Sequence, residues 1–229
     1  MRWRSLMSAQ WRVANNRLLS GFLVLLVMVV PMGLMGCSQN VIVTPSSPSG
    51  VAFVRPAYHI LPIRVSHHAV VPLDNTEIDT ILRLSTRIAQ ERDSLEDVSC
   101  PVAFVRTAPV RAFRNPSFPS FIATPDEYDA IMYGDDANVK VVAGMNWCGQ
   151  TFRPNVLAGC TPAYGPGIAV ASDPVPGRSS TEKDWLKSVL WLHEFGHQFG
   201  LLHRHDAHAV MHPYLELSHT QFTVEECRR

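Results

Sequence analysis

The sequence predicts an α+β domain, because short runs of strand-forming residues accompany two long segments with a helical pattern. In the first segment, residues 74–92, apolar side chains recur at near-helical spacing, with Asp74 or Asn75 as the expected N-cap. The second segment begins at Ser179 and is apolar on nearly every face, which is typical of a helix buried at the centre of its domain. Ser179 and Glu182 have the spacing of a capping box, which marks the expected start of this helix.

The expected strands are short. Runs with strand character occupy residues 58–65, 102–106, 139–143 and 167–171. Pro62 has no backbone N–H, so the first run is expected at a sheet edge or at a bulge. Residues 109–136 contain four prolines, and irregular structure is expected there.

The first 50 residues are expected to form a signal peptide and a tether that precede the folded domain. Residues 1–36 have the basic start and the apolar run of a signal peptide, and Leu34 stands three residues before Cys37. This end resembles a bacterial lipobox, which implies lipid attachment to Cys37 and a place in the cell envelope, by default at the outer membrane of a Gram-negative bacterium. An uncleaved signal anchor and a plain secreted form are the alternatives. Residues 37–50 are expected to form a flexible tether, and residues 51–229 the domain.

Charge and composition argue against a nucleic-acid partner. The chain has 20 basic and 20 acidic side chains and no basic stripe. The first 36 residues hold four arginines and no acid, so the rest is mildly acidic, with 16 basic against 20 acidic side chains. Seven of the ten histidines lie in the last 37 residues, which directs the search for a site to that segment. The sequence carries no signal for an oligomeric state.

Export would permit disulfides among the four cysteines that follow Cys37. Cys148 and Cys160 are the local pair, and Cys100 with Cys227 would then tie the C-terminal segment to the body of the domain. Four cysteines allow three connectivities, and buried free thiols are the remaining alternative.

The second half of the buried helix contains the motif H-E-x-x-H, formed by His193, Glu194 and His197. Residues i and i+4 share a helical face, so both imidazoles can bind one tetrahedral zinc ion while Glu194 stands beside the open position. Gly200 can end the helix with a positive φ, and the turn brings His203 back as a third ligand. Three protein ligands with one open position are typical of a catalytic zinc site, at which Glu194 would act as general base and acid.

The motif extended to His203 resembles that of the metzincin zinc endopeptidases, and residues 209–213 resemble their methionine-containing turn, most closely in the matrixin branch. The resemblance implies a small mixed twisted sheet, a backing helix and a central active-site helix followed by the Met-turn, with Met211 as the floor beneath the zinc. It also implies a peptide or protein substrate held along an edge strand, for which residues 167–171 are the candidate.

Some matrixin features are altered. Leu215, next to Tyr214, stands where many matrixins have an aromatic residue that lines the specificity pocket. A cysteine-switch pro-domain is not recognisable, and neither is a calcium loop; residues 135–138 could bind calcium, although a plain turn is the favoured interpretation. His205 is a rival third ligand, but His203 has the family spacing. The other histidines nearby are expected to be polar loop residues or hydrogen-bond partners of the ligands.

The sequence therefore predicts a zinc-dependent endopeptidase anchored to a membrane by lipid. One alternative is a non-enzymatic envelope lipoprotein that retains a metzincin scaffold to bind a partner or a metal. Another is an enzyme that cleaves cell-wall peptides. A pure binding site has no need of Glu194, which favours an enzyme.

Overall fold

The computed structural model describes residues 58–94, 97–149 and 151–229. The expected signal peptide, the tether and the lipidated Cys37 lie outside these residues, as does the expected start of the domain at Val51. The elements in chain order are β1 (His59–Ile63), β2 (Val65–His67), α1 (Asn75–Gln90), β3 (Val102–Arg106), β4 (Arg111–Ala112), β5 (Phe121–Ile122), α2 (Pro125–Gly134), β6 (Val139–Val142), β7 (Gly144–Cys148), β8 (Thr151–Leu157), β9 (Gly159–Cys160), β10 (Ile168–Ala171), α3 (Ser180–Gln198) and α4 (Val224–Cys227).

The largest sheet has five strands in the order β4-β2-β6-β10-β9. All neighbours pair in parallel except β9, which runs antiparallel to β10 and forms one edge. The expectation that residues 167–171 form the edge strand is wrong, because β10 lies between β6 and β9 and is buried along its whole length. A strand covered on both faces reads as a continuous apolar run, which is the pattern of this segment.

The expected single strand over residues 58–65 is two strands that separate at Arg64. β1 pairs in parallel with β3 in a two-stranded sheet, and β2 joins the five-stranded sheet beside β6. Pro62 lies in β1, whose only strand partner in the described part of the chain is β3, so the proline occupies an edge as expected. A third sheet has the order β5-β7-β8.

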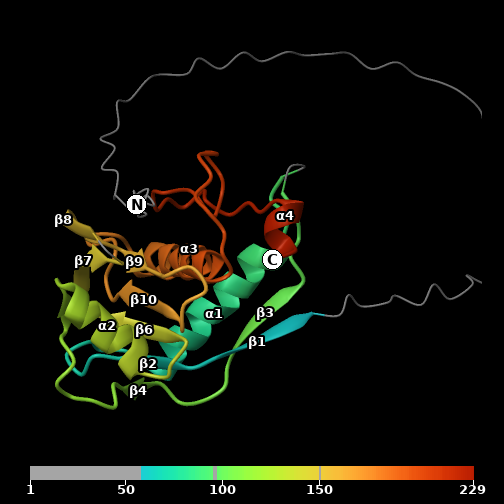
Figure 1. Ribbon diagram of the computed structural model, residues 1–229. Helices are drawn as coiled ribbons and strands as arrows, with labels where there is room; N and C mark the ends of the chain where they lie inside the picture. Colours follow the sequence, from blue (N-terminus) through green and yellow to red (C-terminus); the bar gives the residue numbers. More distant parts are fainter. Residues whose placement is uncertain (1–57, 95–96, 150) are drawn as a thin grey trace, which may run out of the picture. The chain divides into compact units, whose positions relative to one another are not determined.

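Helices α1 and α3 lie side by side (Figure 1). Two hydroxyl groups join them, since Ser85 Oγ donates to the Ser188 carbonyl at 3.3 Å and Ser188 Oγ donates to the Ile81 carbonyl at 3.1 Å. α1 starts as the sequence indicates, and the Asp74 side chain, rather than that of Asn75, accepts the capping bond. This packing fixes the position of α3, the helix that carries the candidate site described below.

The prediction of irregular structure over residues 109–136 is wrong, because this segment contains the short strands β4 and β5 and then α2. Thr124 and Glu127 make a reciprocal capping box, and Pro125 occupies the first turn, where its missing N–H costs nothing. The prolines that suggest a loop thus include one that favours the start of a helix.

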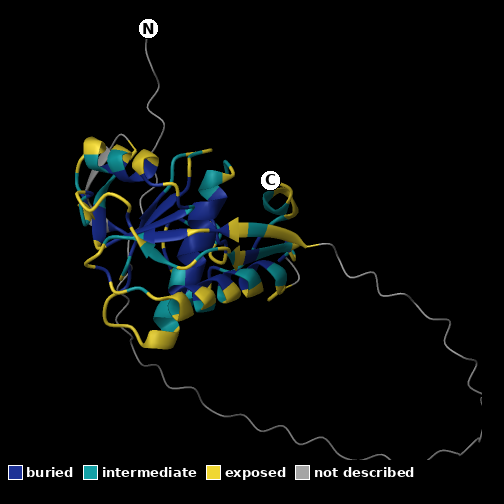
Figure 2. Ribbon diagram, turned by 90° about the horizontal axis from the view of Figure 1, so that it is seen from below, coloured by how far each residue is buried: buried dark blue, intermediate teal, exposed yellow. Residues whose placement is uncertain are grey.

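Two apolar cores cover the faces of the central sheet. Side chains of β10 alternate between them, because Ile168 and Val170 join the core with α1 and α3, whereas Ala169 joins the core with α2. Figure 2 shows that α3 and the sheet are the most buried parts of the fold. Among the residues that the structure describes, none of the helices has the length and apolarity to cross a bilayer.

Disulfides join Cys148 to Cys160 and Cys100 to Cys227. The first links β7 to the edge strand β9, and the second fastens α4 to the segment before β3. The two cross-links therefore secure the edge strand and the C-terminal segment.

The two acids of the turn at residues 135–138 pair with arginines from other parts of the domain. The Asp135 and Asp136 carboxylates both pair with Arg111, at 3.1 and 2.7 Å. Asp136 also pairs with Arg64 and Arg114, and the pKa of Asp135 is lowered, with hydrogen bonds to its carboxylate outweighing the effect of burial. Guanidinium groups thus neutralise the two acids of the segment that could otherwise bind calcium.

Candidate zinc centre

Helix α3 presents the predicted metal ligands from the interior of the fold. Ser179 and Glu182 form the expected capping box at its start, and residues 188–196 are buried without interruption. His193 is completely buried and Glu194 is 1% exposed. Polar groups at such depth are costly unless they are satisfied, so their partners define the site.

The end of α3 turns the chain back toward these side chains. Gly200 has φ +82°, the left-handed conformation, and its N–H donates to the His197 carbonyl at 2.9 Å. The next N–H, of Leu201, donates to the Gly196 carbonyl at 2.9 Å, which completes a Schellman motif. This glycine-dependent turn places His203 beside the helix.

The three histidines converge through their Nε2 atoms. His203 Nε2 lies 3.3 Å from His193 Nε2 and 3.2 Å from His197 Nε2. In the part of the chain that the structure describes, these three residues form the one cluster with metal-ligand geometry. His205, the rival third ligand, is not part of it.

Backbone carbonyls set the tautomers of two of the rings. His193 Nδ1 lies 2.9 Å from the Val210 carbonyl, and His197 Nδ1 lies 2.9 Å from the Leu201 carbonyl. A carbonyl only accepts, so both Nδ1 atoms must donate, and both Nε2 lone pairs face the centre of the cluster. The donor set therefore fits a zinc ion held by three neutral imidazoles.

Electrostatics keep these imidazoles neutral. Burial lowers the pKa of His193 well below its usual value, and the neighbouring His197 and His203 lower it further. Burial also lowers the pKa of His197 and, with help from nearby histidines, brings that of His203 to about 4. Neutral rings bind a metal without first losing a proton.

The Glu194 carboxylate lies against the edge strand. Its Oε2 accepts a 2.7 Å hydrogen bond from Thr161 Oγ1, and its Oε1 sits where a Cβ on Gly159 would collide with it. Burial raises the pKa of Glu194 to about 8, and the Thr161 hydrogen bond opposes that rise. No local sequence pattern indicates Gly159 or Thr161, because more than 30 residues of chain separate them from Glu194.

Met211 lies in the turn that follows the third histidine. It is completely buried, and its Sδ packs so closely on Gly196 that a Cβ there would collide with it. The Met211 carbonyl accepts from the Arg204 N–H at 2.9 Å, and this bond joins the turn to the residue directly after His203. The methionine thus lies under the helix at the level of the histidine cluster.

The surplus histidines form a group beside the centre. The His212 ring lies 4.5 Å from the His219 ring and 6.3 Å from the His205 ring, centroid to centroid. His219 is 1% exposed, and burial lowers its pKa. After the turn, Leu215 is buried and Tyr214 is 39% exposed.

Comparisons with known proteins concern the family and the fold of this chain. Residues 124–227 match the family model of the matrixins, a peptidase family. The structure of mirolysin in complex with compound 9 superposes with a TM-score of 0.55 at 10% identity, covering 76% of this chain and 90% of mirolysin. The α+β fold is therefore similar to that of metzincin catalytic domains. Archaemetzincin from Methanopyrus kandleri matches at 12% identity and a TM-score of 0.48, covering 76% of this chain and 93% of that one. The comparison with curated proteins finds no match.

Within this fold, α3 is the central helix, α1 is the backing helix and β9 is the antiparallel edge strand. The three histidines, Glu194 and Met211 come from a segment of 19 residues. Gly159 and Thr161 come from the edge strand and the residue directly after it. The site is therefore built where α3 meets the edge of the sheet.

Proposed function

We propose that this protein is a zinc-dependent endopeptidase that hydrolyses peptide bonds in a peptide or protein substrate. The observation that supports this most is the convergence of three neutral imidazole Nε2 atoms beside the buried carboxyl of Glu194. A site that only stores zinc needs the histidines but not the acid. The family-model match over residues 124–227 supports a matrixin-like peptidase.

His193, His197 and His203 would hold the zinc ion, which supplies Lewis acidity at the scissile carbonyl and makes a bound water more acidic. Glu194 accepts the proton of the attacking water and delivers it to the leaving amine. A zinc ion bound by the three histidines would favour the carboxylate form of Glu194 and so oppose the effect of burial, which raises the pKa of this group. Thr161 holds one carboxylate oxygen, so that the other remains free for the proton.

The edge strand β9 is the proposed place for an extended substrate. Its one partner in the five-stranded sheet is β10, so its other side carries unpaired backbone groups in that sheet. A peptide that adds there would pair through its main chain, and its scissile bond would pass close to Glu194. This assignment replaces the earlier candidate at residues 167–171.

The N-terminal sequence supports a further part of the proposal, namely that the domain is exported and anchored through lipid on Cys37. Metabolic labelling with a radioactive fatty acid would detect this lipid, and Cys37→Ala should abolish the label. A labelled Cys37→Ala chain would contradict the assignment.

Replacement of Glu194 by glutamine tests the mechanism. Glu194→Gln keeps an oxygen for Thr161 and leaves the three ligands intact, so zinc content should stay at one ion per chain. Cleavage of an unstructured protein such as casein should fall by about 10²- to 10⁴-fold, the usual contribution of a general base. Metal analysis and initial rates, measured on the same preparation, check both statements.

Two outcomes would contradict the proposal. Unchanged cleavage by Glu194→Gln would remove Glu194 from the mechanism. A wild-type protein that is fully loaded with zinc and cleaves neither casein nor a diverse peptide library would instead favour the non-enzymatic binder. With an active protein, the cleavage products of that library define the specificity.

A further inference from the structure

An apolar pocket of about 360 Å³ lies on the side of α3 that does not carry the zinc ligands. Its lining comes from β1, β3, the end of α1, α3 and the C-terminal segment, and it includes neither the three histidines nor Glu194. Leu192, Phe195 and Phe199 line it at the spacing of one helical face. Volumes of this size are typical of sites for small organic ligands.

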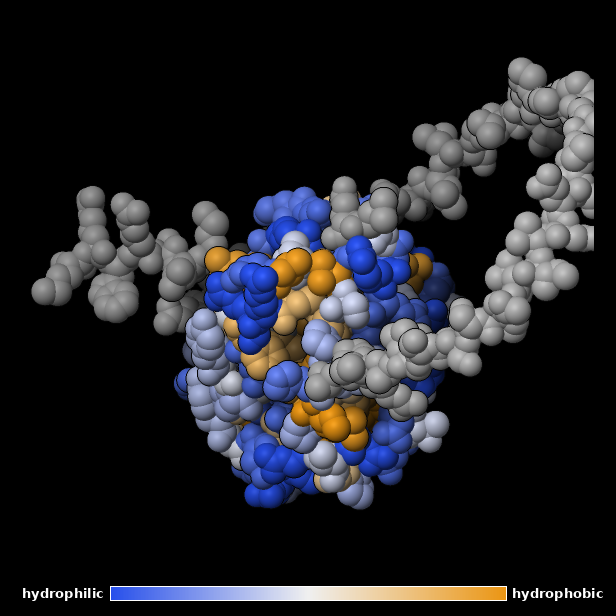
Figure 3. Space-filling model, turned by 90° about the vertical axis from the view of Figure 1, so that its right-hand side faces the viewer, coloured by the Kyte–Doolittle hydropathy of each residue, from blue (hydrophilic) through white to orange (hydrophobic). Residues whose placement is uncertain are grey.

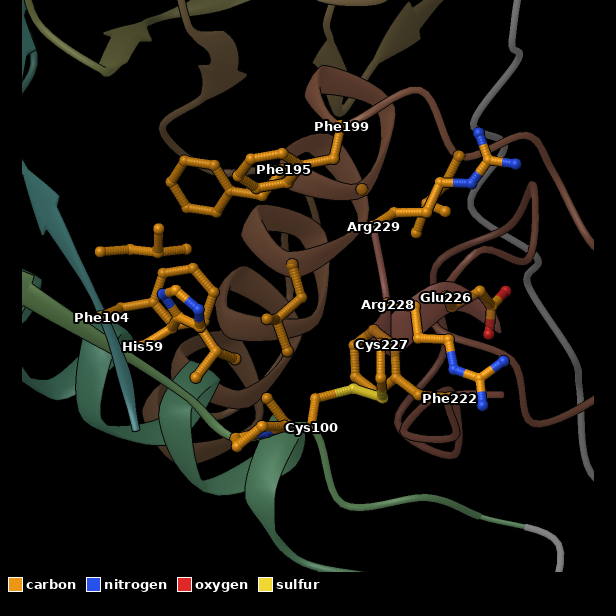
Figure 4. A pocket seen from close by; sticks show the side chains of 17 residues that line it. His59, Cys100, Phe104, Phe195, Phe199, Phe222, Glu226, Cys227, Arg228 and Arg229 are labelled. Carbon is orange, nitrogen blue, oxygen red and sulfur yellow. A yellow bond between two sulfur atoms is a disulfide. The ribbon is translucent and has the colours of Figure 1, made fainter. Parts of the chain in front are cut away.

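The interior of the pocket is hydrocarbon and aromatic. The Phe104 and Phe195 rings stack at 5.3 Å, and both side chains are buried. The Cys100–Cys227 disulfide closes the end opposite these rings, as Figure 4 shows. Figure 3, which views the molecule from the side of β1 and α4, shows hydrophobic surface gathered on this face. Such a lining favours the apolar body of a ligand and offers little to a polar one.

The mouth of the pocket is positively charged. Arg228 and Arg229 lie on the same side of the opening in Figure 4. The guanidinium of Arg228 has no acidic partner among the residues described, and Arg229 pairs loosely with Glu225 at 3.6 Å. The one acid in the lining, Glu226, is already engaged by Arg204 at 3.3 Å and by the Thr223 N–H at 2.7 Å. The unpaired charge at the mouth therefore attracts an anion.

We propose that this pocket binds an amphipathic carboxylate of the fatty-acid type, with the hydrocarbon chain against Leu192 and Phe195 and the carboxylate at Arg228. Charge complementarity decides between ligands that share the same chain, because a carboxylate can pair with the guanidinium of Arg228, whereas a cationic head would be repelled by it. The pocket adjoins the zinc centre through Gly196, which packs on Met211, and through Leu201, whose carbonyl contacts His197 Nδ1. Its lining includes neither the three histidines nor Glu194, so this binding does not require the proposed peptidase activity.

Calorimetric titration of the zinc-loaded full chain with octanoate, decanoate and dodecanoate tests the proposal. Each added methylene that enters the pocket should raise affinity by roughly threefold to fourfold. Decylammonium, which has the same chain as decanoate and the opposite charge, should bind at least about tenfold more weakly than decanoate. Equal binding of the two would overturn the proposal, as would absence of binding by the whole series.

Two variants assign the binding to this pocket. Arg228→Glu should weaken decanoate by about tenfold, whereas Arg83→Glu, an exposed arginine of α1 outside the pocket, should leave it unchanged. Leu61→Trp places a larger side chain in the lining and should abolish binding while Arg228 stays in place. If decanoate binds both Arg228→Glu and Leu61→Trp as tightly as wild type, it binds elsewhere on the chain, and the proposal is overturned.

Discussion

The hydrogen bond between Thr161 and Glu194 orients the acid of the proposed site. Thr161→Val should lower the kcat of peptide hydrolysis by about tenfold, because one bond to a charged group contributes on this scale. KM should change by less than about twofold, since substrate contacts stay in place. Steady-state kinetics measure both constants.

Thr161→Ser is the matched control, because it restores the hydroxyl without the methyl group. A serine variant as slow as the valine variant would assign the effect to packing rather than to the hydrogen bond. A rise in KM with unchanged kcat would place Thr161 in substrate binding instead.

Lys140 is a completely buried cation in β6. Its Nζ donates to the Ala137 carbonyl at 2.7 Å and approaches the Pro166 carbonyl at 3.5 Å. Burial lowers its pKa to about 8, against the opposing influence of Asp135 and Asp136. The charged form is therefore less favourable in the folded protein than in the unfolded chain.

This difference predicts a stability that rises with pH. Above about pH 8 the folded state has released the Lys140 proton, while the unfolded state still binds it up to its usual pKa near 10.5. The free energy of unfolding should therefore increase by about 2 kcal/mol between pH 7.5 and 9.5 relative to Lys140→Met, which has no such proton. Urea unfolding of both proteins at both pH values measures this difference.

Lys183→Met is the control for this effect, since Lys183 pairs with Asp173 near the surface. Unfolding of Lys183→Met at the same two pH values measures the effect of removing a lysine that is not buried. If the wild type and Lys140→Met respond to pH in parallel, Lys140 does not titrate as described.

At the scale of elements, the turn after α3 couples the end of the helix to the position of His203. Gly200 has positive φ, and a Cβ there would also collide with the Tyr164 hydroxyl. Gly200→Ala should cost about 1–2 kcal/mol of stability and should weaken zinc binding by at least about tenfold, because His203 loses its position. Competition with a zinc-binding dye measures the affinity.

Gly177→Ala separates the two effects. Gly177 has the same φ of +82°, but open space surrounds the position of its missing Cβ, and it lies outside the zinc site. Its replacement should cost backbone strain while zinc affinity stays unchanged. Equal loss of zinc affinity in both variants would show that general destabilisation, not the turn at His203, explains the result.

The elements that sequence patterns predict are those whose signals are local. α1 and α3 have caps and a continuous helical period, and the metal motif lies within one helix and its turn. α2 was missed because prolines dominate its neighbourhood, although the Thr124 to Glu127 spacing indicated a cap. The place of β10 inside the sheet and the contact of Thr161 with Glu194 depend on partners distant in sequence, which no local pattern reveals.

At the scale of the whole molecule, two disulfides close loops of very different length. Cys100–Cys227 spans 127 positions and Cys148–Cys160 spans 12. In the chain-entropy description, loss of the long loop costs about 5 kcal/mol of stability and loss of the short one about 3 kcal/mol. Paired Cys→Ser variants compared by denaturant unfolding check this order.

The reverse order would mean that the local link contributes mainly through the folded state, by fixing β9. In that case Cys148→Ser/Cys160→Ser should also lose more peptidase activity than its stability predicts. Assays at a temperature where both variants remain folded separate the two contributions.

The contact between Gly159 and Glu194 has a consequence for related chains. Because no Cβ separates them, the acid and the edge strand cannot vary independently, and a bulkier residue at this position must displace one of them. The two residues should therefore covary across homologues. A homologue that keeps H-E-x-x-H but lacks this glycine should have either a displaced edge strand or a misplaced acid. If the proposed function is correct, such homologues should bind zinc without cleaving peptides.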